Sequence, residues 1–304
     1  MRVLLAGASG TLGGPLVRQL VEAGHEVAGL TRNPGGAEVI RRRSATPIIA
    51  DVLDRESLLR AVDGMHFDAV LHELTALKKA PLRHADMRPT DVLRIRGTRH
   101  LLEAAAATGA RRFITQSIVF GYGYLDHGTA LLTEESPFGE AHGDASDEHI
   151  AAMASTEQQT LSAPGIEGIA LRYGLFYGAD VDSMIGMLRK RMLPVVRGGG
   201  DIPFIHHEDA AAATVAALAR GAGGRIYNIV DDTPGTFSDL VREVARSHSA
   251  TKPLTVPYAL LSVAAPYGKV LFGGTSMRVS NARAKAELGW TPKYASFREG
   301  LAAS

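Results

Sequence analysis

A glycine-rich turn directly after the first apolar run constrains this chain most. The segment 7–13, Gly-Ala-Ser-Gly-Thr-Leu-Gly, separates that run from a stretch with helical spacing. Gly7 permits a tight turn, Gly10 lets a ligand approach the backbone, and Gly13 lets a helix pack against a strand. A strand, such a turn and a helix N-terminus form a site for a dinucleotide pyrophosphate. The predicted contacts in this turn are Gly7, Ser9, Gly10, Thr11, Leu12 and Gly13.

The rest of the first half alternates short apolar runs with segments of helical period. Such alternation predicts an α/β fold with a doubly wound, parallel Rossmann sheet. The predicted strands are 2–6, 26–30, 47–50, 69–71, 112–116 and 168–172, and the predicted helices are 12–23, 36–43, 56–62, 90–107 and 147–161.

After residue 173 the pattern becomes irregular. Helices are predicted at 181–191, 210–220, 239–246 and 281–288, and a strand at 225–230. We therefore expect a dinucleotide-binding domain over 1–172. A smaller, interleaved substrate-binding region is expected over 173–304, with part of it returning to the Rossmann core.

Composition excludes several classes of site. The 304 residues carry 33 Lys and Arg against 32 Asp and Glu, so no nucleic-acid footprint is expected. The chain has no cysteine, which excludes disulfides and thiolate chemistry. No signal segment or membrane span is recognised, and a cytoplasmic protein without membrane contact is expected. The run 41–43, three arginines, is interpreted as the solvated end of a helix, with a phosphate contact as the alternative. The segment 206–209, His-His-Glu-Asp, is not expected to bind metal, because neighbouring strand residues point to opposite faces.

Several further motifs occur in a fixed order along the chain. They are Asp51-Val52, the GT-x-x-LL-x-AA segment 97–105, the strand 112–117, LRYGLFYG at 171–178, FIHHED at 204–209 and LGWTP at 288–292. Together with the glycine turn they resemble the extended short-chain dehydrogenase/reductase superfamily, of the NAD-dependent epimerase/dehydratase type. The resemblance covers nearly the whole chain and implies a nicotinamide cofactor.

The end of the second predicted strand indicates which cofactor. An acidic residue there would bind the ribose diol of NAD, but this chain has Thr31, Arg32 and Asn33. Arg32 can pair with the 2′-phosphate of NADP, so NADP(H) is preferred and NAD(H) remains possible. The alternative is a solvated arginine in a loop. Further cofactor contacts are expected from Asp51, Val52, Leu74, Thr75, Gln116, Met153 and Tyr173.

The usual catalytic pair of this family is missing. The family resemblance implies a Tyr with a Lys four residues later, but no Tyr-x-x-x-Lys occurs in the chain. Glu157 matches a family position four residues beyond that Lys, which puts His149 at the Tyr position and Met153 at the Lys position. An ungapped match puts Ile118 at the position of the assisting hydroxyl, whereas a one-residue slip would put Ser117 there.

Four residues are therefore catalytic candidates. A neutral imidazole exchanges a proton near pH 7 without a neighbouring Lys, so His149 is the first candidate, and a surface histidine is the alternative. Tyr122 and Tyr124 follow the fifth strand and are alternative phenolic donors, or packing residues of the loop. Ser117 is the fourth candidate.

The sequence leaves three functions open. They are an NADP(H)-dependent oxidoreductase with a substituted acid, a non-redox cyclase, isomerase or lyase that keeps the dinucleotide, and a non-catalytic NADP(H) sensor. Leu175 and Ile202 stand where nucleotide-sugar enzymes of this family have Asn and Arg, so a lipophilic small molecule is expected instead. A homodimer through helices 90–107 and 147–161 is possible.

Overall fold

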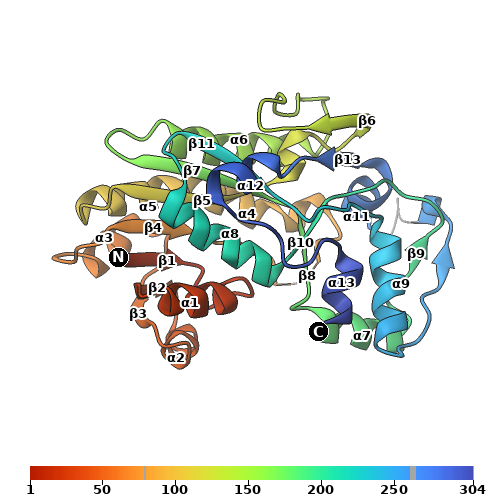
Figure 1. The fold of residues 1–304 in the computed structure, drawn as a ribbon, viewed down its shortest axis with the longest axis horizontal. Coiled ribbons are helices and arrows are strands. Elements are labelled where there is room, and N and C mark those ends of the chain that lie inside the picture. The colour runs from red at the N-terminus through yellow and green to blue at the C-terminus, as the bar shows by residue number, and fades with distance from the viewer. Residues whose placement is uncertain (79, 261–264, 304) are drawn as a thin grey trace.

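A seven-stranded parallel sheet forms the centre of the molecule. The structure is a computed structural model that describes residues 1–78, 80–260 and 265–303. The strands are β1 (Arg2–Ala6), β2 (Glu26–Thr31), β3 (Thr46–Ile49), β4 (Ala69–His72), β5 (Arg112–Ile118), β7 (Glu167–Tyr173) and β11 (Arg225–Ile229). Their order is β11-β7-β5-β4-β1-β2-β3, and every neighbouring pair is parallel (Figure 1). The predicted doubly wound Rossmann sheet is thus confirmed.

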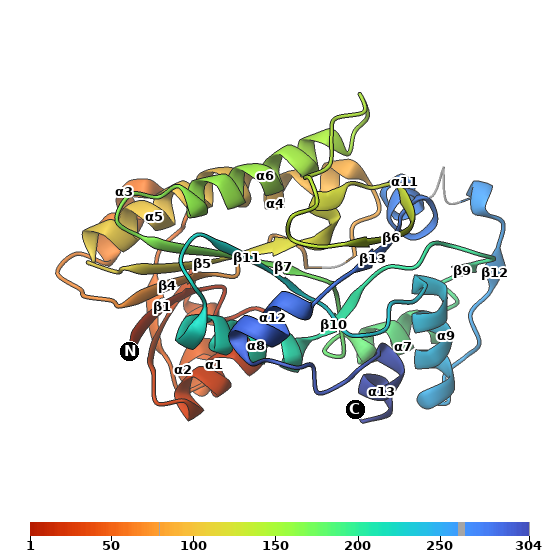
Figure 2. The ribbon, with the colours of Figure 1, turned by 45° about the horizontal axis from the view of Figure 1, so that its top comes forward.

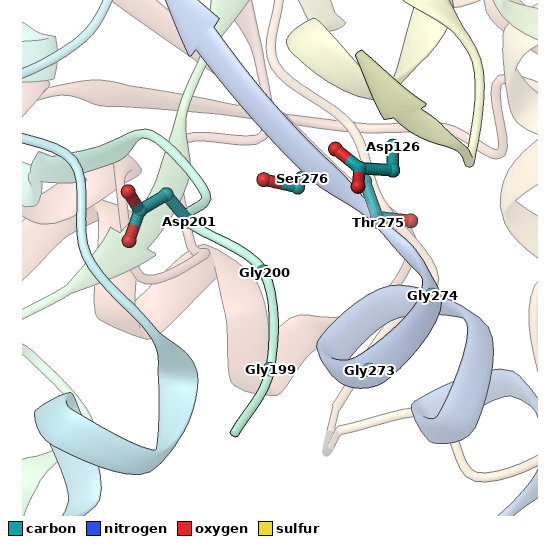
Figure 3. A pocket seen from close by; sticks show the side chains of 8 residues that line it. All are labelled: Asp126, Gly199, Gly200, Asp201, Gly273, Gly274, Thr275 and Ser276. Carbon is teal, nitrogen blue, oxygen red and sulfur yellow. The ribbon is translucent and has the colours of Figure 1, made fainter. Parts of the chain in front are cut away.

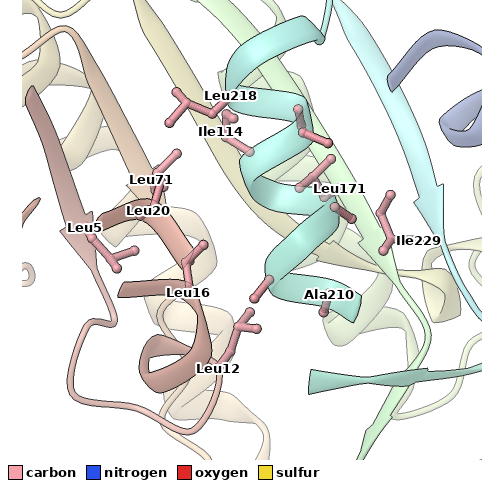
Figure 4. Close-up of a cluster of buried hydrophobic side chains, with 14 of the residues drawn as sticks. Leu5, Leu12, Leu16, Leu20, Leu71, Ile114, Leu171, Ala210, Leu218 and Ile229 are labelled. Atoms are coloured by element: carbon pink, nitrogen blue, oxygen red, sulfur yellow. The ribbon is translucent and has the colours of Figure 1, made fainter. Parts of the chain in front are cut away.

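Two layers of helices cover this sheet. One face carries α1 (Gly13–Glu22), α2 (Pro34–Arg42), α8 (His207–Arg220) and α12 (Ala282–Leu288), and the other carries α3 (Arg55–Ala61), α4 (Arg88–Val92), α5 (Thr98–Ala107) and α6 (Asp147–Leu161) (Figure 2). Strands covered on both faces become continuous apolar runs, as in β1 and β4, which are buried almost throughout. Figure 4 shows side chains of α1 and α8 meeting over the sheet, among them Leu16, Leu20 and Leu218.

The predicted helix 90–107 is helical throughout but not regular. A π-helical turn, η2 (Leu93–Gly97), separates α4 from α5. At this wide turn the Arg94 carbonyl accepts hydrogen bonds from the hydroxyls of Thr98 at 2.5 Å and Thr156 at 2.6 Å. Two side chains thus stabilise a backbone irregularity that periodicity alone does not reveal.

The second half supplies the remaining short elements. Its helices are α7 (Val181–Arg189), α9 (Phe237–Ser247), α11 (Pro266–Lys269), η4 (Val270–Gly274) and α13 (Phe297–Ala302), and the first half adds η1 (His84–Asp86) and η3 (Val119–Tyr122). Three parallel pairs lie outside the central sheet: β6 (Asp126–Leu132) with β13 (Ser276–Val279), β8 (Leu175–Tyr177) with β10 (Phe204–His206), and β9 (Val195–Val196) with β12 (Thr255–Val256).

The two halves of the chain share the central sheet. β11 lies beyond residue 172, yet it pairs with β7 along the edge of the sheet. α8 also comes from the second half and packs against α1. Among the described residues, no helix has the length and apolar character needed to cross a membrane.

Candidate functional site

The glycine turn has the tight geometry that a pyrophosphate site requires. Gly7 has φ of 111°, a left-handed value that favours glycine, and its carbonyl accepts a hydrogen bond from Gly10 at 2.9 Å. A Cβ on Gly13 would lie 2.3 Å from the Gly7 carbonyl oxygen, and one on Gly7 would lie 2.5 Å from the Glu73 carbonyl oxygen. Ser9 and Thr11 are exposed beside the N-terminus of α1. The residues present therefore fit a dinucleotide pyrophosphate.

The end of β2 holds the three residues that the sequence assigned to cofactor selection. Thr31 is buried, and the Asn33 side chain caps α2 by accepting the Gly36 N–H at 2.9 Å. Arg32 is exposed between them. No carboxylate occupies this strand end, so nothing there would repel a 2′-phosphate.

The pair after β3 lies next along the same edge. Asp51 Oδ1 accepts the Leu53 N–H at 2.9 Å, and Val52 is buried beneath Gly97. Asp51 is half-buried, which leaves part of its side chain accessible.

The three arginines 41–43 differ in exposure: two face solvent and one is half-buried. Arg41 and Arg42 are exposed and lie 3.3 and 3.9 Å from Glu38, as a solvated helix end predicts. For Arg43 the prediction is wrong. Its side chain is half-buried against the glycine turn, where Nη1 donates to the carbonyls of Ala8 at 2.6 Å and Gly10 at 3.0 Å.

A buried carboxyl group lies behind the turn at the end of β4. Burial raises the pKa of Glu73 to about 8, although a hydrogen bond from Tyr173 at 3.3 Å opposes the rise. The Tyr173 hydroxyl also lies 2.7 Å from that of Thr214 on α8. Tyr173 was predicted to contact the cofactor. Its side chain is fully buried, and its hydroxyl is not exposed to a ligand. Beyond Glu73, Leu74 is half-buried and Thr75 is exposed.

The Ser117 hydroxyl points to an ion pair and not to an open site. It donates to Glu157 Oε1 at 2.6 Å, while Arg172 holds the same carboxylate with two hydrogen bonds of 2.8 and 2.7 Å. All three residues are buried. The next residue, Ile118, and Gln116 before it are half-buried on the opposite side of β5. Ser117 and Ile118 therefore face opposite sides of β5, with Ser117 turned to the ion pair.

The two tyrosines after β5 differ in their surroundings. The Tyr122 hydroxyl lies 2.8 Å from both the Thr133 carbonyl and the Asn228 side-chain oxygen, and the residue is buried. Tyr124 stacks on Phe120, and its hydroxyl lies 3.1 Å from that of Tyr267. Burial raises the pKa of both Tyr122 and Tyr124, so neither phenol is prepared to act as a base near neutral pH.

His149 belongs to a hydrogen-bonded chain of side chains from three segments. Its Nδ1 lies 2.7 Å from Asp91 Oδ2, and its Nε2 lies 3.1 Å from His84 Nδ1. Arg94 pairs with the same aspartate at 3.3 Å. His149 has no exposed surface, which rules out the surface-histidine alternative, whereas His84 is half-buried. Met153, one helical turn along α6, is also fully buried.

Aromatic rings pack around the hydrogen-bonded array of His149, His84 and Asp91. His84 and His149 stack with centroids 5.3 Å apart and an interplanar angle of 6°. Tyr267 meets both rings edge-on, at 5.3 and 5.7 Å. Burial and the neighbouring His149 imidazole lower the pKa of His84, while Asp144, Glu148 and the Ala145 carbonyl oppose that effect.

His84, Asp91, Arg94 and Tyr267 were not predicted from the sequence. Asp91 and His84 lie 58 and 65 residues from His149 along the chain, so no local motif joins them. The one available signal was the acidic residue three positions before Arg94, a spacing that places both on one helix face.

Within the ranges that the structure describes, neither a metal cluster nor a hollow beside β13 adds to the predicted site. Among the described residues, no group of three His, Asp or Glu side chains lies close enough together to hold a metal ion. A hollow of ≈ 380 Å³ opens between the loop after β9 and the start of β13 (Figure 3). It contains none of the predicted site residues and is lined by Asp126, Gly199, Gly200, Asp201, Gly273, Gly274, Thr275 and Ser276.

Comparison with known proteins extends this description. Residues 3–230 match the model of the NAD dependent epimerase/dehydratase family. A 3-diazoavenalumate denitrifying reductase from Streptomyces sp. is 36% identical, and the match covers 99% of each chain. A 4-hydroxy-2-methyl-3-oxo-4-farnesyl-3,4-dihydroquinoline-1-oxide ketoreductase from Stigmatella aurantiaca is 27% identical over 90% of this chain and 81% of its own.

A solved structure shares the fold. A dTDP-glucose 4,6-dehydratase from Streptomyces venezuelae, with NAD bound, superimposes with a TM-score of 0.78 over 100% of this chain and 95% of its own. At 22% identity this likeness concerns the fold alone.

Replacing Gly13 tests the turn. We expect Gly13→Ala to weaken dinucleotide binding by about tenfold or more, because its methyl group would overlap the Gly7 carbonyl oxygen. The matched control is Gly186→Ala in α7, where a Cβ meets no atom within 4 Å. Titration calorimetry with both nicotinamide nucleotides measures the effect, and unchanged affinity in Gly13→Ala would contradict this account of the turn.

Replacing Glu73 tests the buried carboxyl group. Its pKa is raised on folding, so its contribution to stability is complete below the ordinary value near 4.5 and is lost as pH rises through about 8. Relative to Glu73→Gln, the wild type should therefore lose on the order of a few kcal/mol of unfolding free energy across that range. Urea unfolding of both proteins at several pH values measures this difference, and two parallel pH profiles would refute it.

Proposed function

The chain belongs to the NAD-dependent epimerase/dehydratase family, and on that premise we propose that it is an NADP(H)-dependent reductase acting on a small, largely apolar organic molecule. The observation that carries this proposal is the glycine turn, with its close backbone contacts, in a chain whose full-length relative is named a reductase. When bound, the nicotinamide would supply a hydride. The chain's own residues then have to bind the acceptor, exclude water and provide a proton.

The choice of NADP(H) rests on the end of β2. Arg32 is exposed there, and the strand end has no carboxylate that could bind the ribose diol of NAD. The Asn33 side-chain oxygen is already used to cap α2. A guanidinium without an acidic neighbour favours a 2′-phosphate over a free hydroxyl.

The proton would come from the two stacked histidines. The Asp91 carboxylate can only accept a hydrogen bond, so His149 donates through Nδ1 and its Nε2 is left as an acceptor. That acceptor faces His84 Nδ1, which must donate in turn. Asp91 thus fixes the tautomer of His149, and His149 orients His84.

In this arrangement His84 is the group that meets the acceptor. It keeps some exposed surface, whereas His149 has none and acts as a positioning residue behind it. With Nδ1 donating to His149, His84 can give a proton to the acceptor only from its imidazolium form, through Nε2, and its lowered pKa makes that imidazolium a stronger acid. This replaces the direct role that the sequence suggested for His149.

The proposed substrate class rests on two apolar residues, Leu175 and Ile202, and on the names of the relatives. Leu175 is half-buried and Ile202 is fully buried, so neither offers a charge to a substrate diphosphate. A ketone takes one hydride at carbon and one proton at oxygen. A neutral diazo carbon likewise takes one hydride and one proton and releases N₂. Either acceptor, of the kinds named for the two relatives, would suit a site with one proton donor.

The reductase proposal is tested by cofactor consumption. The purified protein is incubated with NADPH and a panel of aryl ketones, 3-oxo esters and diazo arenes, while the absorbance of the reduced nicotinamide is followed. We expect oxidation of NADPH with at least one class. Conversion of a compound without net oxidation would favour a non-redox enzyme, and no conversion of any compound would remove the reductase proposal.

The histidine pair is tested by substitution. We expect His84→Gln and His149→Gln each to lower turnover about 100-fold, the usual size of a proton-transfer contribution, without changing nucleotide affinity. Glutamine at 149 can still donate to Asp91 but cannot pass a proton. The control is His66→Gln, an exposed histidine outside the chain of contacts.

Turnover as a function of pH separates the two roles. The wild-type rate should fall as rising pH removes the proton from the donor, and this fall should be absent in a variant that has lost the donor. A purely structural defect would instead lower the rate by the same factor at every pH. An unaffected rate in His84→Gln would exclude His84 as the donor.

A further inference from the structure

Arg43 is a cation held at the cofactor turn by backbone contacts alone. It follows the last residue of α2, and Ser44 after it has φ of 62°, which ends the helix sharply. The side chain turns back to the glycine turn, where Nη1 donates to the carbonyls of Ala8 and Gly10. These two carbonyls flank Ser9.

This cation has no acidic partner in the described part of the chain. Its neighbours Arg41 and Arg42 both pair with Glu38, whereas Arg43 makes hydrogen bonds to carbonyls only. Burial and the charge of Arg42 lower the pKa of Arg43, the direction expected for a cation that lacks a counter-charge. Its Nε and Nη2 groups make no hydrogen bond to a described residue and lie over the first turn of α1, where a Cβ on Gly14 would be 3.2 Å from Nη2.

The turn that Arg43 holds lies between the start of α1 and the end of β2. A Cβ on Gly29 of β2 would lie 2.7 Å from the Ala8 methyl and 2.9 Å from Cγ2 of Ile40 on α2. Ala8 therefore packs against β2 and α2. The pyrophosphate belongs at the N-terminus of α1, and the ribose 2′ position belongs at the end of β2 beside Arg32.

We infer that Arg43 is a second residue, besides Arg32, that recognises the 2′-phosphate of NADP(H). The inference rests on the proposed NADP(H) preference and assigns part of it to a residue outside the strand end. A guanidinium fixed through Nη1 can direct its remaining N–H groups at a phosphate without losing its hold on the turn.

Nucleotide affinities test this assignment without any substrate. Titration calorimetry gives Kd for NADPH and NADH with the wild type and with Arg43→Gln, Arg43→Lys and Arg32→Gln. We expect the wild type to prefer NADPH and Arg43→Gln to lower that preference about tenfold or more, chiefly through weaker NADPH binding. Arg43→Lys keeps the charge and should retain part of the preference. The matched controls are Arg41→Gln and Arg42→Gln, which should leave both affinities unchanged.

Each outcome has a distinct meaning. If Arg43→Gln weakens NADPH and NADH equally, the residue only supports the turn and the assignment is wrong. If it keeps the wild-type preference, the assignment is also wrong while the NADP(H) proposal stands. If the wild type itself shows no preference for NADPH, both fail. If circular dichroism shows that Arg43→Gln is unfolded, the ratio of the NADH and NADPH Kd values of Arg43→Lys decides. An unreduced preference for NADPH in Arg43→Lys, together with complete loss of that preference in Arg32→Gln, would assign the phosphate to Arg32 alone.

Discussion

The close approach of Gly13 to the Gly7 carbonyl is the contact on which the rest of this molecule depends. With 2.3 Å between that oxygen and an added Cβ, only glycine lets α1 begin directly above the end of β1. The same approach aims the first N–H groups of α1 at one point above the sheet edge. It also brings the turn against β4, where the Glu73 carbonyl leaves no room for a side chain on Gly7. The nucleotide site is therefore part of the packing of the sheet, and its geometry cannot change independently of the core.

Much of this sheet and its helices could be predicted because their signals are local. Buried parallel strands are short apolar runs, and the helices between them have a regular period. The short paired strands escaped prediction for the opposite reason. β6 pairs with β13 although about half the chain separates them, and β6 lacks the alternation of a strand while β13 alternates over only four residues. The π-helical turn inside the predicted helix 90–107 also leaves no mark in the period of apolar residues.

The residues of the candidate site likewise fall into those that local sequence predicts and those that it does not. The turn residues 7–13 could be found because one short segment builds them. By contrast, three consecutive arginines have identical chemistry, and only the helix end at Ser44 directs Arg43 inward while Arg41 and Arg42 face solvent. Ser117 was ambiguous for a related reason, since a one-residue shift along a strand moves a side chain to the other face. The Glu157–Arg172 ion pair resolves it, because a buried carboxylate held by two guanidinium bonds also takes the serine hydroxyl.

The π-helical turn connects this backbone detail to the chemistry of the site. Because Thr98 and Thr156 bind the Arg94 carbonyl, the turn is fixed to both α5 and α6. Arg94 then pairs with Asp91, and the free oxygen of that carboxylate receives His149 from α6. Both oxygens of the Asp91 carboxylate are therefore used, one by a guanidinium and one by an imidazole. On the reductase proposal, this array is what gives α6 a group able to exchange protons. The two stacked rings are thus positioned by α4 and by the π-helical turn, and His84, which is half-buried, comes from η1 in the segment after β4.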